Sequence, residues 1–111
     1  MNRFYTFSKK SRIKKKAEFR VIYTSGEKFF SDYYCVFYKP SSENRLGISI
    51  PKKFGKSVYR NLQKRILREA FRKSKVSFKN PKDIVIVMRR KPMDKAKQTM
   101  DIERIFQWLS Q

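Results

Sequence analysis

The chain has 111 residues, enough for one compact domain and too few for two. Its 29 lysines and arginines against nine acidic residues give a formal net charge of +20, which favours nucleic acid as the partner and an anionic membrane surface second. Ten Phe, six Tyr and one Trp within 40% hydrophobic residues exclude a disordered basic tail.

Several kinds of chemistry are excluded by the residues that the sequence lacks. There is no histidine and Cys35 is the only cysteine, which removes internal disulfides, the common zinc sites, Cys–His nucleophiles and histidine acid–base catalysis. A lone Cys35 in an aromatic segment is expected to be a buried structural thiol, and the cytoplasm is the expected compartment. No apolar run approaches the ~20 residues of a spanning helix, and no signal peptide or membrane partner is expected.

The N-terminal half predicts an arm, a helix and a strand. Residues 1–11 are basic and aromatic without a period, and we expect a loosely held arm. Residues 17–26 predict a helix, with Phe19, Ile22 and Tyr23 at helical spacing and Gly26 as its stop. Residues 29–39 predict one strand. Its alternation places Tyr34, Val36 and Tyr38 on one face and Tyr33, Cys35 and Phe37 on the other.

The C-terminal half predicts two more strands and two helices. Residues 45–50 alternate as a strand, which we expect to form an antiparallel hairpin with the strand before it. After a long helix over residues 57–78, the apolar residues 83–88 predict a strand buried on both faces and parallel to a hairpin strand. Residues 94–109 predict a last helix with Met100, Ile105, Phe106 and Leu109 toward the core. The order α-β-β-α-β-α indicates a single α+β domain.

The long helix combines an apolar side with a strongly cationic side. At ~100° per residue, the apolar side holds Val58, Tyr59, Leu62, Ile66, Leu67 and Ala70, with Phe71 near the boundary. The other side holds Arg60, Asn61, Lys64, Arg65, Arg68 and Arg72. An ordinary solvated helix mixes both signs of charge, and Glu69 is the only acid here. This bias favours a polyanion on the cationic side, with a merely solvated amphipathic helix as the alternative.

The central residues resemble the signature of a known family. The pattern is Gly47-x-Ser49-x-x-Lys52-Lys53-x-Gly55-x-x-Val58-x-Arg60-Asn61-x-x-Lys64-Arg65-x-x-Arg68-Glu69-x-Phe71. It is similar to that of the bacterial ribonuclease P protein subunit, and the resemblance extends over nearly the whole chain, from Arg12-x-x-Lys15 to the C-terminal helix.

The resemblance implies both a fold and an activity. The fold is a small α/β sandwich with a left-handed βαβ crossover, against the general right-handed rule. The activity is that of a ribonucleoprotein in which one protein joins one catalytic RNA. It removes the 5′ leader of precursor tRNA with Mg²⁺ held mainly by the RNA, and the protein subunit contributes no catalytic residue.

The resemblance also implies two sets of RNA contacts. Contacts with the catalytic RNA fall on Lys52, Lys53, Lys56, Arg60, Asn61, Lys64, Arg65, Arg68 and Arg72. Here Leu62 replaces the family's usual Arg, and Gln63 stands where an apolar residue is common. We interpret the pair as a small rotation of the buried side, with Lys56 or Arg72 replacing the lost phosphate contact. Contacts with the single-stranded leader fall on Phe19, Tyr23, Tyr34, Val36, Arg89, Arg90 and Lys91.

Other interpretations remain at this point. Phe19, Tyr23, Tyr34 and Val36 could each be ordinary core residues. A nuclease acting without RNA would need clustered carboxylates, whereas the nine acids are scattered along the chain. The segment around Gly55 lacks P-loop spacing, and we expect a tight turn near a phosphate there. The rival function is that of a purely structural RNA-binding protein, such as a ribosomal one.

Overall fold

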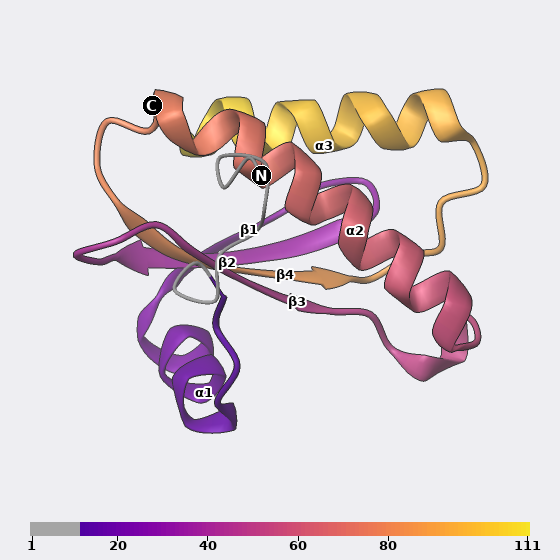
Figure 1. The fold of residues 1–111 in the computed structure, drawn as a ribbon, viewed down its shortest axis with the longest axis horizontal. Helices are drawn as coiled ribbons and strands as arrows, with labels where there is room; N and C mark the ends of the chain where they lie inside the picture. Colours follow the sequence, from indigo (N-terminus) through magenta and orange to yellow (C-terminus); the bar gives the residue numbers. More distant parts are fainter. Residues whose placement is uncertain (1–11) are drawn as a thin grey trace, which may run out of the picture.

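A four-stranded sheet separates one helix from two others in the computed structural model (Figure 1). The structure describes residues 12–111, so the predicted arm at 1–11 lies outside it. The elements are α1 (Lys16–Ser25), β1 (Glu27–Phe30), β2 (Tyr34–Pro40), β3 (Arg45–Ser49), the 3₁₀ helix η3 (Lys52–Phe54), α2 (Ser57–Ser74), the 3₁₀ helix η4 (Lys75–Ser77), β4 (Lys82–Met88) and α3 (Lys95–Leu109). No helix of the described part is long and apolar enough to cross a membrane.

The single strand predicted over residues 29–39 is wrong, because the chain turns at Ser31–Tyr33 and forms the antiparallel pair β1 and β2. Asp101 of α3 holds this turn. Its carboxylate accepts hydrogen bonds from the Ser31 hydroxyl at 2.7 Å and from the backbone N–H groups of Asp32 and Tyr33, each at 3.1 Å. The turn is therefore fixed by a residue nearly seventy positions away, which local sequence patterns do not reveal.

The antiparallel hairpin predicted between residues 29–39 and residues 45–50 is also wrong. The sheet order is β1-β2-β4-β3, so β4 lies between β2 and β3, antiparallel to the first and parallel to the second. Ile84, Val85 and Ile86 are fully buried, which confirms the prediction of a strand covered on both faces. The parallel pair β3 and β4 joined by α2 confirms the βαβ unit, while its left-handed sense stays a prediction.

The main core lies between the sheet and the pair α2 and α3, and it corrects the predicted faces of both helices. The buried residues of α2 are Gln63, Leu67 and Phe71, whereas Val58 is 84% and Leu62 50% exposed. On α3, Met100 is exposed, against the prediction. The burial of Ile105, Phe106 and Leu109 confirms the rest of that face.

Hydrogen bonds among three buried side chains explain why Gln63 is buried in place of Leu62. The Gln98 amide N–H₂ donates to the Gln63 side-chain oxygen at 2.6 Å and to the Tyr34 hydroxyl oxygen at 2.9 Å. A buried amide is tolerated where its hydrogen bonds are made. Burial raises the pKa of Tyr34 to about 12, so its hydroxyl stays protonated near neutral pH. The hydrogen bonds among these three side chains therefore link α2, α3 and β2.

We predict that Asp101→Ala destabilises the fold by about 2–3 kcal/mol, because it leaves three donors of the β1–β2 turn without their acceptor. The free energy of unfolding in urea measures this loss. Asp94→Ala is the matched control, since Asp94 caps α3 at an exposed site and accepts from the Lys97 N–H. It should lose only about 1 kcal/mol. Equal losses would contradict the role assigned to Asp101.

Candidate nucleic-acid interface

The sheet face beside α1 carries a small second core. Three aromatic residues at its edge, Phe19, Tyr23 and Phe37, form what we call the aromatic border. Ile13, Ile22 and Val85 are buried in this core, and Phe19, Phe37 and Val87 pack against them half-buried. The Tyr23 ring meets Phe37 edge-on at 4.8 Å between centroids and lies 6.2 Å from Phe19. Tyr23 is 39% exposed, and burial of its hydroxyl end raises its pKa. The border therefore offers a neutral aromatic surface.

A row of four small or uncharged residues crosses this face beside the aromatic border. Pairing places Ser49 opposite Val87, Val87 opposite Cys35, and Cys35 opposite Phe30, so the row runs from β3 to β1. Directly opposed residues have their side chains on the same face of a sheet. Burial raises the pKa of the Cys35 thiol, as expected for a structural cysteine, with Lys28 and Arg89 opposing that shift. We call these four residues the sheet row.

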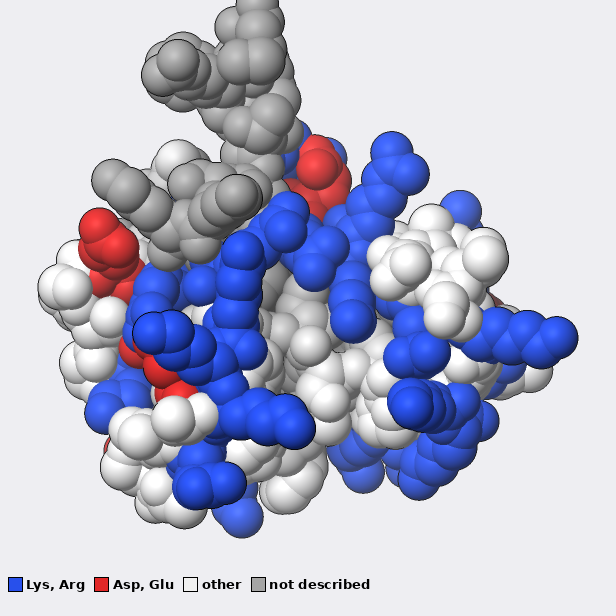
Figure 2. Space-filling view, turned by 60° about the horizontal axis from the view of Figure 1, so that its bottom comes forward, with Lys and Arg blue, Asp and Glu red and all other residues white. Residues whose placement is uncertain are grey.

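Cations lie near this uncharged surface, since Lys28 and Arg89 are close enough to Cys35 to affect its pKa. Figure 2 shows lysine and arginine side chains gathered on both sides of a pale strip of uncharged surface. With a net charge of +20 the cations repel one another until anions approach. Single-stranded nucleic acid satisfies both features, since its bases stack on aromatic faces while its phosphates meet cations.

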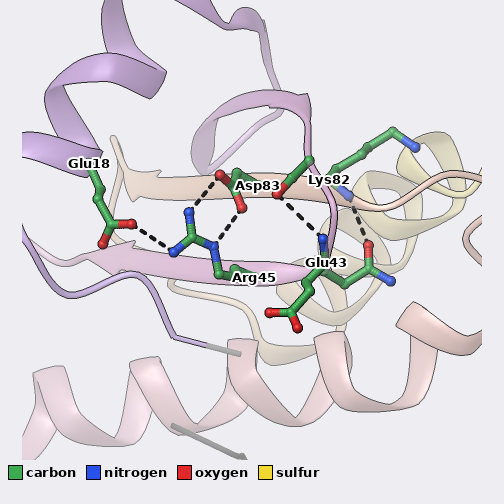
Figure 3. Close-up of polar contacts among 7 residues, drawn as sticks. Glu18, Glu43, Arg45, Lys82 and Asp83 are labelled. Carbon is green, nitrogen blue, oxygen red and sulfur yellow. Dashed lines mark hydrogen bonds and ion pairs between the residues drawn. The ribbon is translucent and has the colours of Figure 1, made fainter. Parts of the chain in front are cut away.

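The ion pairs of Arg45 hold α1 against the sheet (Figure 3). The Arg45 guanidinium donates two hydrogen bonds of 2.8 Å to Asp83 on β4 and one of 2.7 Å to Glu18 on α1. These contacts raise the pKa of Arg45, with Asp83 the larger cause. A bidentate arginine has a defined orientation, so the ion pairs of Arg45 with Asp83 and Glu18 position the Phe19 and Tyr23 side chains of α1 over the sheet.

The structure places two of the predicted leader contacts on the wrong face. Tyr34 and Val36 have no exposed surface, and both belong to the core beneath α2 and α3. A leader on the α1 side cannot touch them, so this prediction is wrong by one residue. The adjacent positions Cys35 and Phe37 lie on the α1 face instead, because successive residues of a strand point to opposite faces.

On the predicted cationic side of α2, Arg65 lines the groove beside α3, whereas Asn61, Lys64, Arg68 and Arg72 form a flank outside that groove. Asn61 and Arg65 are exposed, and Lys64, Arg68 and Arg72 are half-buried. Burial, together with the charge of nearby Arg12, lowers the pKa of Arg68. Arg72 pairs with Glu69, and that hydrogen bond lowers the pKa of the carboxylate. Arg12 belongs to the segment that pairs with Leu46 of β3, so this flank adjoins the β3 edge of the sheet.

The basic loop and the end of β4 meet at the start of α2. Lys52, Lys53 and Lys56 are exposed, and Arg60 donates to the Gly55 carbonyl at 3.2 Å and the Ser57 hydroxyl at 3.3 Å. The Lys91 ammonium lies 4.8 Å from the Tyr59 ring, which joins residues 89–91 to the loop. Gly55 has an extended backbone. It is needed because a Cβ there would lie 2.7 Å from the Tyr59 ring.

Most acidic side chains in the described part already serve the fold. Glu18 and Asp83 hold Arg45, Asp101 holds the β1–β2 turn, and Asp94 caps α3. Glu27 accepts from the Tyr38 hydroxyl at 2.8 Å. In residues 12–111, no three His, Cys, Asp or Glu side chains form a group that could hold a metal ion.

Comparison with known proteins identifies the family. The family model described as Ribonuclease P matches residues 7–109 of the chain. The chain belongs to the ribonuclease P protein family. The ribonuclease P protein component of Thermotoga petrophila is 36% identical over 95 residues, covering 84% of this chain and 81% of that protein. The component of Clostridium kluyveri is 41% identical over 83 residues, covering 71% and 74%.

Solved structures of the family agree with this fold. The RNase P protein of Staphylococcus aureus superposes with a TM-score of 0.82 at 31% identity, covering 91% of this chain and 98% of that one. The RNase P protein of Thermotoga maritima gives 0.75 at 29%, covering 89% and 94%. The chain is thus a protein subunit of ribonuclease P, a tRNA-processing ribonucleoprotein, and its partner is the ribonuclease P RNA.

The departure from the ribonuclease P signature at Leu62 and Gln63 is now explained. We expected the pair to mark a rotation that buries position 62, which is wrong, because Leu62 is half exposed and faces a groove beside α3. Gln63 occupies the buried position and bonds Gln98. Position 62 therefore lies on the α3 side of the helix, opposite the cationic flank.

Sequence reasoning missed several residues of the interface. Phe37 was assigned to the correct strand face but not to the predicted leader contacts, and neither Phe30 nor Arg12 was among the predicted RNA contacts. The aromatic pattern of residues 33–38 could have indicated Phe37 once the face toward α1 was known. Arg12 belongs to the Arg12-x-x-Lys15 part of the family resemblance, but only the pairing of its segment with β3 shows that it lies near Arg68.

We predict that Gly47→Ala displaces Phe19 and destabilises the protein by about 1–3 kcal/mol. A Cβ on Gly47 would lie 2.7 Å from the Phe19 Cζ and 3.2 Å from the Ile13 Cβ. Urea unfolding measures the loss, and faster amide exchange in α1 should accompany it. Combining Gly47→Ala with Phe19→Leu should recover part of the stability, since the smaller side chain vacates the space. Additive losses would show that the two residues are not coupled.

Proposed function

We propose that the chain binds the ribonuclease P RNA through the cationic flank of α2 and the basic loop, and the 5′ leader of precursor tRNA on the sheet face beside α1. Hydrolysis of the phosphodiester bond belongs to the RNA, with Mg²⁺ held mainly by that RNA. One protein serves one RNA in the cytoplasm. The chain supplies affinity and orientation for the leader and no reacting group.

One observation carries this proposal: an aromatic, uncharged surface adjoins a rigid cationic helix flank at the β3 edge. Phe19, Tyr23 and Phe37 provide stacking surfaces, each worth ~1–3 kcal/mol per base and tolerant of sequence. Lys64 and Arg68 provide charges for a phosphate backbone. A leader crossing the sheet beside α1 would thus begin next to the RNA that cuts it.

The engaged carboxylates support assigning the chemistry to the RNA. Glu18, Asp83 and Asp101 each accept hydrogen bonds that position α1 or the β1–β2 turn. Recruiting them to a metal would remove those contacts. The contribution of this chain is then to hold the leader in place, which reduces the entropic cost of positioning the substrate at the RNA.

Reconstitution with a bacterial ribonuclease P RNA tests the proposal directly. Cleavage of precursor tRNA should be stimulated at low Mg²⁺ concentration, where the RNA alone binds its substrate poorly. Absence of stimulation would reject the proposal and favour a structural RNA-binding role.

We predict that Tyr23→Ala weakens holoenzyme binding of precursor tRNA about fivefold or more and leaves mature tRNA unaffected, because it removes a stacking surface for the leader. Equilibrium binding of the two tRNA forms measures the difference. Val21→Ala is the control, since Val21 is an exposed residue of the same helix at 48% exposure. An equal loss for both tRNA forms would instead assign Tyr23 to the core.

We predict that Lys64→Ala with Arg68→Ala weakens binding of the ribonuclease P RNA and lowers the slope of log affinity against log salt by about one per lost contact. The control is Lys73→Ala, which lies about two and a half turns from Lys64 and so on the opposite flank. Lys73 lines the groove beside α3. A slope that stays the same in the double variant would remove these residues from the RNA interface.

A further inference from the structure

A hollow of about 350 Å³ lies at the β1 edge of the sheet, between the β1–β2 turn and the end of α3. Its walls include Phe30, Arg89, Arg104 and Trp108. The size falls within the range of small-ligand sites and suits a single nucleotide. None of the contacts assigned so far explains why exposed aromatics and arginines meet here.

The indole of Trp108 is held as a platform with one side free. It packs against Phe29 at 4.6 Å between ring centroids and meets Tyr38 edge-on at 5.4 Å. Even so, Trp108 is 46% exposed. An aromatic ring immobilised by two others stacks an unpaired base without losing conformational freedom of its own.

Arginines stand on two sides of this platform. Arg104 precedes Trp108 by four residues in α3, so both lie on the same face of the helix. The Arg89 guanidinium lies 5.6 Å from the Phe30 ring centre and donates to the Ser31 carbonyl at 2.9 Å, which orients it. Of the acids in the wall, Asp101 is buried and already accepts three hydrogen bonds, whereas Asp32 is exposed at the rim. Arg89 and Arg104 can thus both attract a phosphate in the hollow, while the negative charge of Asp32 partly offsets theirs.

The hollow continues the surface proposed for the leader. Phe30 ends the sheet row Ser49–Val87–Cys35–Phe30 and also lines the hollow. Three interstrand spacings of ~4.8 Å make this row roughly 14 Å long. The row starts at the β3 edge, beside the cationic flank of α2, and ends at the opposite edge of the sheet. A strand that crosses the row arrives at Phe30, and it reaches Trp108, which packs on Phe29 of the opposite face, only by passing around the β1 edge.

We propose that the hollow is a distal subsite for single-stranded RNA, in which Trp108 stacks a leader base and Arg89 and Arg104 bind the adjoining phosphates. This inference rests on the proposed function. The bases held here are further from the cleavage site than those beside α1. The subsite makes affinity depend on leader length, since only a leader long enough to pass the β1 edge reaches Trp108.

The test uses the reconstituted holoenzyme and precursor tRNAs whose leaders are lengthened one nucleotide at a time. Trp108 is the only tryptophan of the chain, so indole fluorescence reports directly on this site. Emission should be quenched only when the leader exceeds a threshold length, and affinity should rise at the same length. Quenching by mature tRNA or by the shortest leader would overturn the proposal, because it would place another part of the RNA at Trp108.

Two pairs of variants complete the test. Trp108→Leu should lower affinity about fivefold for long leaders and leave short leaders unchanged, while Trp108→Phe should retain most of the affinity. Arg104→Gln should also weaken only long leaders, whereas Glu103→Gln, a neighbouring exposed change, should not weaken binding. Equal binding of long leaders by Trp108→Leu and the unaltered protein would overturn the subsite. The proposed function would still stand if Tyr23→Ala discriminates precursor from mature tRNA.

Discussion

The position of β4 between β2 and β3 is the constraint on which the remaining structure depends. Because β4 is covered on both faces, its alternate residues serve two cores, with Ile84 and Ile86 beneath α2 and α3 and Val85 beneath α1. The same strand carries Asp83, which orients Arg45 and through it α1. Arg89 follows directly after the last residue of β4, and the Arg89 side chain reaches Phe30 of β1. One strand therefore positions the aromatic border, the ion pairs of Arg45 and one arginine of the distal hollow.

The distribution of charge follows from a shortage of acids. With nine carboxylates for 29 cations, the chain uses acids for part-buried donors at Arg45 and at the β1–β2 turn, and it uses Asp94 to cap α3 at an exposed site. Nine carboxylates cannot neutralise 29 cations, so most of the positive charge has no compensating acid. The mutual repulsion of the cations is relieved by a polyanion, so the same imbalance that opposes compaction favours RNA binding.

The departure at Leu62 and Gln63 shows how a family motif adapts without moving its helix. Gln63 is buried because Gln98 and Tyr34 supply a polar environment, and burying an amide without such partners would be unfavourable. Leu62 then lies with Arg65 at the groove beside α3, which leaves Lys64 and Arg68 on the flank that adjoins β3. Lys64 and Arg68 thus stay on a different side of α2 from Leu62 despite the altered pattern.

The sequence by itself determined the elements whose signals are local: the three helices, the strand 83–88 buried on both faces and the cationic side of α2. The family signature added the ribonuclease P assignment. Only the tertiary structure decided the strand order and the division of residues 29–39 into β1 and β2. It also decided that Phe37, and not Tyr34, lies on the face beside α1. These depend on contacts between distant residues, such as Asp101 with the β1–β2 turn, and a shift of one residue in a strand moves each side chain to the opposite face. Periodicity can define two faces of a strand, but only packing against α1 or α2 determines which face is buried and which remains for RNA.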